Sequence, residues 1–130
     1  MGLLMLRTAI LVLFLAVLAS RANAGVMLYC SGYTGSGVLL SHRIFVDIDR
    51  KTMAVDANIY TLRSATYDEF VGAIDVDQVS GSYDRHNRQM AINRKTGRFK
   101  HQDRQSNPAL RAQNKWQIES EYTGSCLQEE

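Results

Sequence analysis

Basic side chains crowd one stretch of this 130-residue chain, between Asp84 and Arg104. Only Asp84 and Asp103 oppose them there. If the turns of this stretch face the same way, they form a positive patch suited to an anionic partner, such as a polysaccharide, lipid headgroups or an acidic protein surface. The alternative is that these side chains form the water-facing side of two hairpins, where charge protects strand edges from aggregation. The candidate binding residues are Arg85, Arg88, Arg94, Lys95, Arg98 and Lys100.

Two pairs of carboxylates have strand spacing, Asp47 with Asp49 and Asp75 with Asp77. Paired carboxylates can hold calcium or perform acid–base chemistry. The sequence from Asp75 does not match a calcium loop of the EF-hand type, which needs an oxygen ligand at the fifth position and glycine at the sixth, where this chain has valine and serine. The pattern favours a solvated strand face with cross-strand charge pairs.

The histidines His42, His86 and His101 are far apart and lack the spacing of a zinc site, which needs three or four converging ligands. We expect His86, in a charged turn, to face solvent. Ser36 is preceded directly by Gly35 and does not fit a nucleophile elbow, and the glycine-rich loop around it lacks the lysine of a phosphate loop. The sequence therefore predicts no catalytic activity, no metal and no cofactor, with a hydrolase or metal enzyme as the least favoured alternative.

The first 24 residues have the form of a cleaved signal peptide. Arg7 precedes an apolar core at 9–18, and 22–24 read Ala-Asn-Ala, a small-x-small cleavage site. Ten apolar residues are fewer than the ~20 of a membrane span, although a short anchor remains the alternative. The predicted mature chain is one small β-domain, 25–130, periplasmic or secreted, with no integral membrane segment. Without Arg7 and Arg21 the 15 basic residues fall to 13, equal to the 13 acidic ones, so nucleic-acid binding is not expected.

Cys30 and Cys126 are the only cysteines, and both lie in the exported part. An even number of cysteines in an exported protein predicts a disulfide, here closing almost the whole domain. Free thiols or a metal pair are the alternatives. Each cysteine lies near a copy of Tyr-Thr-Gly-Ser, at 33–36 and 122–125. We interpret these copies as turn geometry that the disulfide brings together, with the glycines permitting tight turns.

Alternation of apolar and polar residues dominates the rest of the chain and predicts strands at 43–49, 53–60, 72–79, 89–93, 98–101 and 114–122. A hairpin turn at 93–97 ends in a left-handed Gly97. Short helical turns are expected at 66–69 and after Asn107, where Pro108 occupies the first helical position. The predicted fold is all-β, a small antiparallel barrel or a strongly curved sheet with one disulfide. The predicted core comprises Ile44, Val46, Ile48, Val55, Ile59, Ile74, Val76, Met90, Ile92, Phe99, Trp116, Ile118 and Tyr122.

The mature chain opens with Leu-Tyr-Cys, closes with Tyr-Thr-Gly-Ser-Cys and has short hairpins between. In this framing it resembles small exported β-domain proteins of Gram-negative bacteria without assigned function. It is also similar in outline to the periplasmic C-type lysozyme inhibitors, small β-barrels that plug a lysozyme cleft. That family carries a serine-glycine-x-x-tyrosine loop, and here 80–83 reads Ser-Gly-Ser-Tyr, one residue shorter. Its lysine-glycine segment is echoed by Lys95-Thr96-Gly97.

Composition and motifs together predict a soluble exported binding protein without catalytic activity. Its partner is expected to be an unknown protein or an anionic component of the cell envelope, contacted through the arginine-rich hairpins. Lysozyme inhibition, which the resemblance implies, is the alternative.

Overall fold

Eight antiparallel strands, each paired with the next and the last with the first, close into a barrel in our computed structural model, which describes residues 25–129. The strands are β1 (Val26–Tyr33), β2 (Leu39–Asp47), β3 (Thr52–Val55), β4 (Asn58–Ala65), β5 (Glu69–Val76), β6 (Arg85–Asn93), β7 (Arg98–Ser106) and β8 (Gln117–Gln128). The predicted all-β fold is confirmed. The predicted signal peptide, 1–24, lies outside the described residues. No helix within 25–129 is long and apolar enough to cross a membrane.

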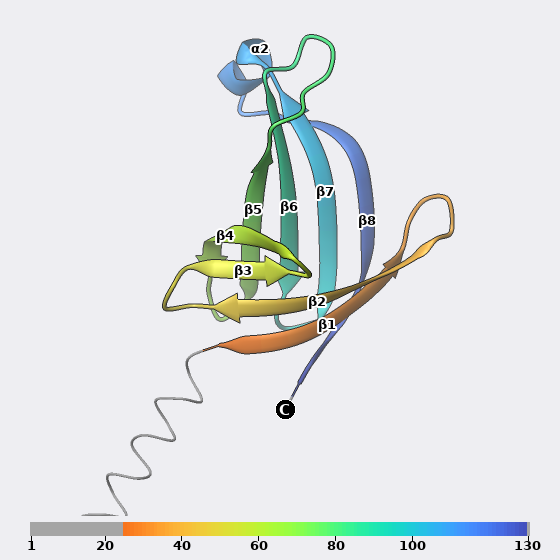
Figure 1. Ribbon diagram of the computed structural model, residues 1–130, viewed down its shortest axis with the longest axis vertical. Helices are drawn as coiled ribbons and strands as arrows, with labels where there is room; N and C mark the ends of the chain where they lie inside the picture. The colour runs from red at the N-terminus through yellow and green to blue at the C-terminus, as the bar shows by residue number, and fades with distance from the viewer. Residues whose placement is uncertain (1–24, 130) are drawn as a thin grey trace, which may run out of the picture.

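The two ends of the barrel differ. Figure 1 shows β5 to β8 upright, β1 to β4 crossing their lower half, and α2 (Pro108–Ala112) above them. The β3–β4 hairpin is short: Leu39–Arg43 of β2 pair only with β1, and Ile74–Val76 of β5 pair only with β6. We call the end with α2 and the 77–84 loop the α2 end, and the end with turns 48–51, 66–68 and 94–97 the turn end.

The interior at the turn end is apolar and densely buried. The predicted core residues Ile44, Val46, Val55, Met90, Ile92 and Phe99 are all buried, and Ile74 and Tyr122 pack against them. Each fully buried aliphatic or aromatic side chain contributes roughly 1.5–3 kcal/mol relative to exposure. The core also contains Leu28, Met53, Tyr60, Leu62 and Phe70, which the sequence analysis had not included.

Two predicted core residues are exposed because turns interrupt the alternation. Ile48 belongs to the turn after β2 and is 39% exposed. The predicted strand 53–60 is two strands, divided by a tight turn in which Asp56 has a φ of 53°. Crossing this turn changes the face that alternate residues occupy, so Ile59 is exposed and Tyr60 is buried.

A bulge explains why Trp116 and Ile118 are not in the core. Ser120 of β8 pairs with Asp103 of β7, but the next residue of β7, Arg104, pairs with Ile118. The residue between them, Glu119, is therefore an extra residue in β8. An extra residue moves those that precede it in the chain to the other face of the sheet. Ile118 is exposed, and Trp116 lies just outside β8, over Arg104.

The predicted disulfide joins Cys30 of β1 to Cys126 of β8, which are direct cross-strand partners with Cα atoms 4.0 Å apart. A disulfide fits an oxidising, extracellular location. The same pairing places Tyr33 opposite Thr123, so the two Tyr-Thr-Gly-Ser copies meet at this one pair, whereas 34–36 lie in the loop after β1. Gly124 does not form a turn, contrary to our interpretation. It lies in mid-strand, where a Cβ would stand 2.0 Å from the carbonyl oxygen of Ser31.

Two of the three predicted local motifs are confirmed. Gly97 has a φ of 73° and donates its N–H to the carbonyl of Asn93 at 2.9 Å, as the hairpin turn requires. The side chain of Asn107 accepts the N–H of Leu110 and caps α2. The helical turn predicted at 66–69 is wrong: it is the β4–β5 turn, where the hydroxyl of Thr66 accepts the N–H of Glu69 at 3.1 Å.

Candidate functional site

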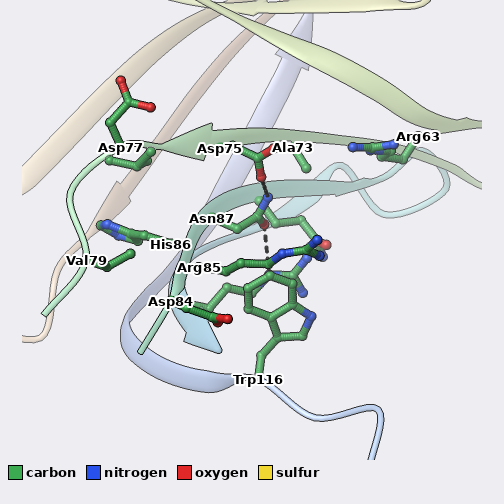
Figure 2. A pocket seen from close by; sticks show the side chains of 13 residues that line it. Arg63, Ala73, Asp75, Asp77, Val79, Asp84, Arg85, His86, Asn87 and Trp116 are labelled. Carbon is green, nitrogen blue, oxygen red and sulfur yellow. Dashed lines mark hydrogen bonds between the residues drawn. The ribbon is translucent and has the colours of Figure 1, made fainter. Parts of the chain in front are cut away.

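An open pocket of about 630 Å³ lies on the outer face of the barrel at the α2 end (Figure 2). It spans the outward-facing side chains of β5, β6 and β7 and is bordered by the 77–84 loop and by Trp116. In Figure 2, Asp75 and Asn87 lie between Arg63 on one side and Trp116 on another. We call this the outer pocket.

A row of hydrogen-bonded side chains crosses the outer pocket from strand to strand. Asp75, Asn87 and Arg104 are successive cross-strand partners on β5, β6 and β7. The amide of Asn87 donates to Asp75 at 3.2 Å and accepts from Nε of Arg104 at 3.0 Å. The Arg104 guanidinium lies over the Trp116 ring, 4.4 Å from its centroid, and burial lowers the Arg104 pKa. Asn87 is itself buried, so the row forms a rigid floor.

Both irregularities in the barrel's strand pairing fall beside this pocket. In β4, Leu62 pairs with Gly72 and Ser64 pairs with Val71, so Arg63 is an extra, bulged residue. In β8, the bulge at Glu119 moves Trp116 to the outer side. Bulges concentrate next to functional sites, where they redirect a side chain. Here each bulge supplies one wall of the outer pocket.

Charges of both signs line the outer pocket. Asp84 accepts a bidentate pair of hydrogen bonds from Arg111 at 2.5 and 2.8 Å, and this contact lowers the Asp84 pKa. Arg63 and Arg85 form no ion pair with any carboxylate of residues 25–129, so their guanidinium groups remain available for an incoming anion.

The structure separates the six basic residues proposed from the sequence. Arg85 lines the outer pocket. Arg88 lies on the same face of β6 as the buried Met90 and contacts Asp103 at 3.4 Å. The hairpin turns on either side of β6 lie at opposite ends of the barrel, so one surface cannot hold all six.

The other four lie toward the turn end. Arg94 donates to the carbonyl of Thr66 at 2.6 Å and covers the ring of Phe70. Lys95 pairs with Asp68 at 3.0 Å. The remaining two, Arg98 and Lys100, are exposed on the outer face of β7. Whether any of these residues binds a partner stays a prediction.

A second polar cluster occupies the barrel interior near the α2 end. His42 contacts Asp56 through Nδ1 at 2.7 Å and the hydroxyl of Tyr122 through Nε2. His101 stacks on His42 at 6.0 Å and lies 3.2 Å from the hydroxyl of Tyr60. Burial, reinforced by the neighbouring His42, lowers the His101 pKa to about 4, and burial raises the Tyr122 pKa to about 12.

This interior cluster is satisfied within itself. Across residues 25–129, every buried side-chain nitrogen or oxygen has a hydrogen-bond partner. The contacts of His42 connect β2 to the β3–β4 turn and to β8, so the cluster holds the barrel wall together where β2 has no strand partner on one side. Sequence spacing had given no reason for His42 and His101 to meet; the barrel topology brings them together.

The prediction that His86 faces solvent is wrong. Its ring is largely buried, with Nδ1 2.6 Å from the carbonyl oxygen of Gln78 and Nε2 against Asp103. These contacts fasten the 77–84 loop, which borders the outer pocket, to β7. Within the described part of the chain, no group of three or more histidine, cysteine or acidic side chains is placed to hold a metal.

The paired aspartates lie at opposite ends of the barrel. Asp47 accepts the backbone N–H of Arg50 in the turn after β2, at 3.1 Å. The second pair, Asp75 and Asp77, lines the outer pocket. The partner of Asp75 is the Asn87 amide, where we had expected an arginine or lysine.

Sequence reasoning missed most of the outer pocket. Arg63 lies outside the basic cluster, and Trp116 had been assigned to the core by its alternation with Ile118. The one available signal was the position of Trp116, shortly after the predicted helical turn at Asn107, because side chains near such connections often serve function.

The chain was compared with protein-family models, with curated proteins and with solved structures, and none of them matches it.

Proposed function

We propose that this chain is an exported, non-catalytic binding protein of the bacterial periplasm, and that the outer pocket takes an anionic component of the cell envelope. The signal-like sequence at 1–24 and the disulfide motivate the compartment. The partner's charge follows from Arg63 and Arg85, two guanidinium groups without a carboxylate partner in the described chain.

The observation that carries this proposal is the coincidence of both strand bulges with one pocket. A bulge interrupts strand hydrogen bonding and is retained where it redirects a side chain. In this barrel the two bulges place Arg63 and Trp116 around a hydrogen-bonded polar row whose central residue, Asn87, is buried. A binding site built on strands and held by hydrogen bonds keeps its geometry when the ligand arrives, which favours affinity.

Retention on cell-envelope fractions tests the proposal. Immobilised wild-type protein is compared with the charge-reversed double variant Arg63→Glu/Arg85→Glu. The matched control is Arg98→Glu/Lys100→Glu, which reverses two exposed charges on β7 away from the outer pocket. We expect the first variant to lose the retained component and the control to keep it.

Equal retention by the wild type and the Arg63→Glu/Arg85→Glu variant would refute the proposal. If only the Arg98→Glu/Lys100→Glu control loses the retained component, the binding surface lies toward the turn end and not at the outer pocket. Arg88 is unsuitable for this test, because its contact with the largely buried Asp103 makes a charge reversal a stability change. The Lys100–Glu121 contact, at 3.9 Å, lies between exposed side chains and contributes little, so Lys100 can serve in the control. Lysozyme inhibition, the other function expected from the sequence, is measured in parallel as slower lysis of bacterial walls on adding the protein.

A further inference from the structure

We infer that the ligand of the outer pocket is a saccharide carrying a carboxylate group, with the carboxylate held by Arg63 and Arg85. This inference rests on the proposed function and narrows it from an anionic envelope component to one chemical class. It follows from the charge balance of the pocket, from its neutral polar groups and from its size.

The charge balance excludes a dense polyanion. Asp75, Asp77 and Asp84 line the same pocket as the arginines. A polyphosphate or a nucleic-acid strand would bring successive negative charges against these carboxylates, and like charges in contact disfavour binding. A ligand with one anionic group among neutral ones avoids this repulsion. Arginine's planar fork matches a planar carboxylate through two parallel hydrogen bonds.

The neutral part of the lining suits hydroxyl groups and ring C–H faces. Gln89 lies beside the Asn87–Arg104 row and presents an amide that can both donate and accept. Apolar surface comes from Val76, Val79 and Trp116. Sugar rings carry hydroxyls around an edge and apolar faces above and below, so they use both kinds of surface at once.

The volume sets the length of the ligand. A pocket of about 630 Å³ lies within the ~300–1,000 Å³ range of small-molecule sites. It accommodates a few sugar rings. A folded protein partner would need a broader contact, since stable protein interfaces bury roughly 800 Å² on each side.

Tryptophan fluorescence measures binding at this position, because Trp116 is the only tryptophan in the chain and it lines the pocket. The full-length mature protein is titrated with four probes: two trisaccharides that each carry a single carboxylate, sialyllactose and glucuronosyl-xylobiose, the neutral trisaccharide cellotriose, and inorganic phosphate. We expect a saturable change in Trp116 emission with at least one carboxylated trisaccharide, and no saturable change with cellotriose or phosphate.

Single substitutions assign the contacts. Arg63→Ala and Arg85→Ala should each weaken binding roughly 10- to 100-fold, the loss typical of a hydrogen bond to a charged group. Arg85→Lys should recover only part of the affinity, because lysine keeps the charge but lacks the fork. The control Arg98→Ala should bind as the wild type does. Circular dichroism confirms that each variant is folded.

Three results would overturn the inference: binding of neither carboxylated trisaccharide, equal binding of cellotriose, or displacement by phosphate at matched concentration. If any one of these results is found while retention on envelope fractions still depends on Arg63 and Arg85, only the assignment of the ligand as a carboxylated saccharide fails. If that retention is also independent of both arginines, the proposed function fails as well.

Discussion

Breaking the Cys30–Cys126 disulfide should lower the free energy of unfolding by about 4–5 kcal/mol. The two cysteines are 96 residues apart, and the chain-entropy model gives about 4.7 kcal/mol for a loop of that length. Single domains are stable by only about 5–15 kcal/mol, so this one bond supplies a large share. The β1–β8 strand pairing on either side of the bond remains, so the reduced protein should still fold at low temperature.

Denaturation in guanidinium, followed by circular dichroism with and without a reductant, measures this effect. The reduced wild type isolates the cross-link because it keeps both sulfur atoms. The double variant Cys30→Ala/Cys126→Ala should be less stable still, because it also loses two buried side-chain groups. In thermal melts the difference corresponds to a drop of about 20 °C for a domain of this size.

Equal midpoints for oxidised and reduced protein would refute the reasoning, since they would show that strand pairing alone restrains the two chain ends. A loss of binding at the outer pocket in folded, reduced protein would also contradict it, because neither cysteine lines that pocket.

Three further predictions concern stability. The His101 pKa is lowered from 6.5 to about 4 in the folded protein, so the unfolded chain takes up the proton at a higher pH than the folded protein does. The free energy of unfolding should therefore fall by about 2 kcal/mol as the pH is lowered from 6.5 to 4. Denaturation curves of His101→Gln should show a weaker dependence of this free energy on pH, whereas an unchanged dependence would assign it to other groups. Gly124→Ala should cost about 2–3 kcal/mol because its Cβ meets backbone, whereas Gly35→Ala, with open space around it, should be neutral; equal melting temperatures would contradict this. Asn107→Ala should cost about 1 kcal/mol by removing the cap of α2, measured by the same melts, and no loss would show that the cap is unimportant.

The alternation of apolar and polar residues predicted the buried positions correctly in the part of the barrel where each strand keeps one face toward the core. Ile44 and Val46 on β2, and Met90 and Ile92 on β6, are buried as expected, because burial of one face imposes a period of two. The disulfide followed from the even number of cysteines and from the export that the sequence predicts. These features depend on local pattern and composition, which a single sequence contains.

The outer pocket depends on features that local pattern does not contain. A one-residue bulge reverses every assignment beyond it, and its position is set by the partner strand. Trp116, which the sequence predicted in the core, therefore lines the pocket. Arg63 also lines the pocket, although no other basic residue lies near it in the sequence. The basic cluster was misleading as a single surface, because β6 separates its two turns by the length of the barrel.

Oxidative footprinting with hydroxyl radicals tests the central claim most directly, because it locates the binding surface without knowing the ligand. The protein is oxidised alone and with envelope extract, and the modification of each aromatic residue is measured by mass spectrometry. Trp116 reports on the outer pocket, and Tyr67, 86% exposed in the turn after β4, is the internal control at the turn end. We predict that the extract protects Trp116 and leaves Tyr67 unchanged. Protection of Tyr67 with unchanged oxidation of Trp116 would contradict the assignment of the binding site to the outer pocket.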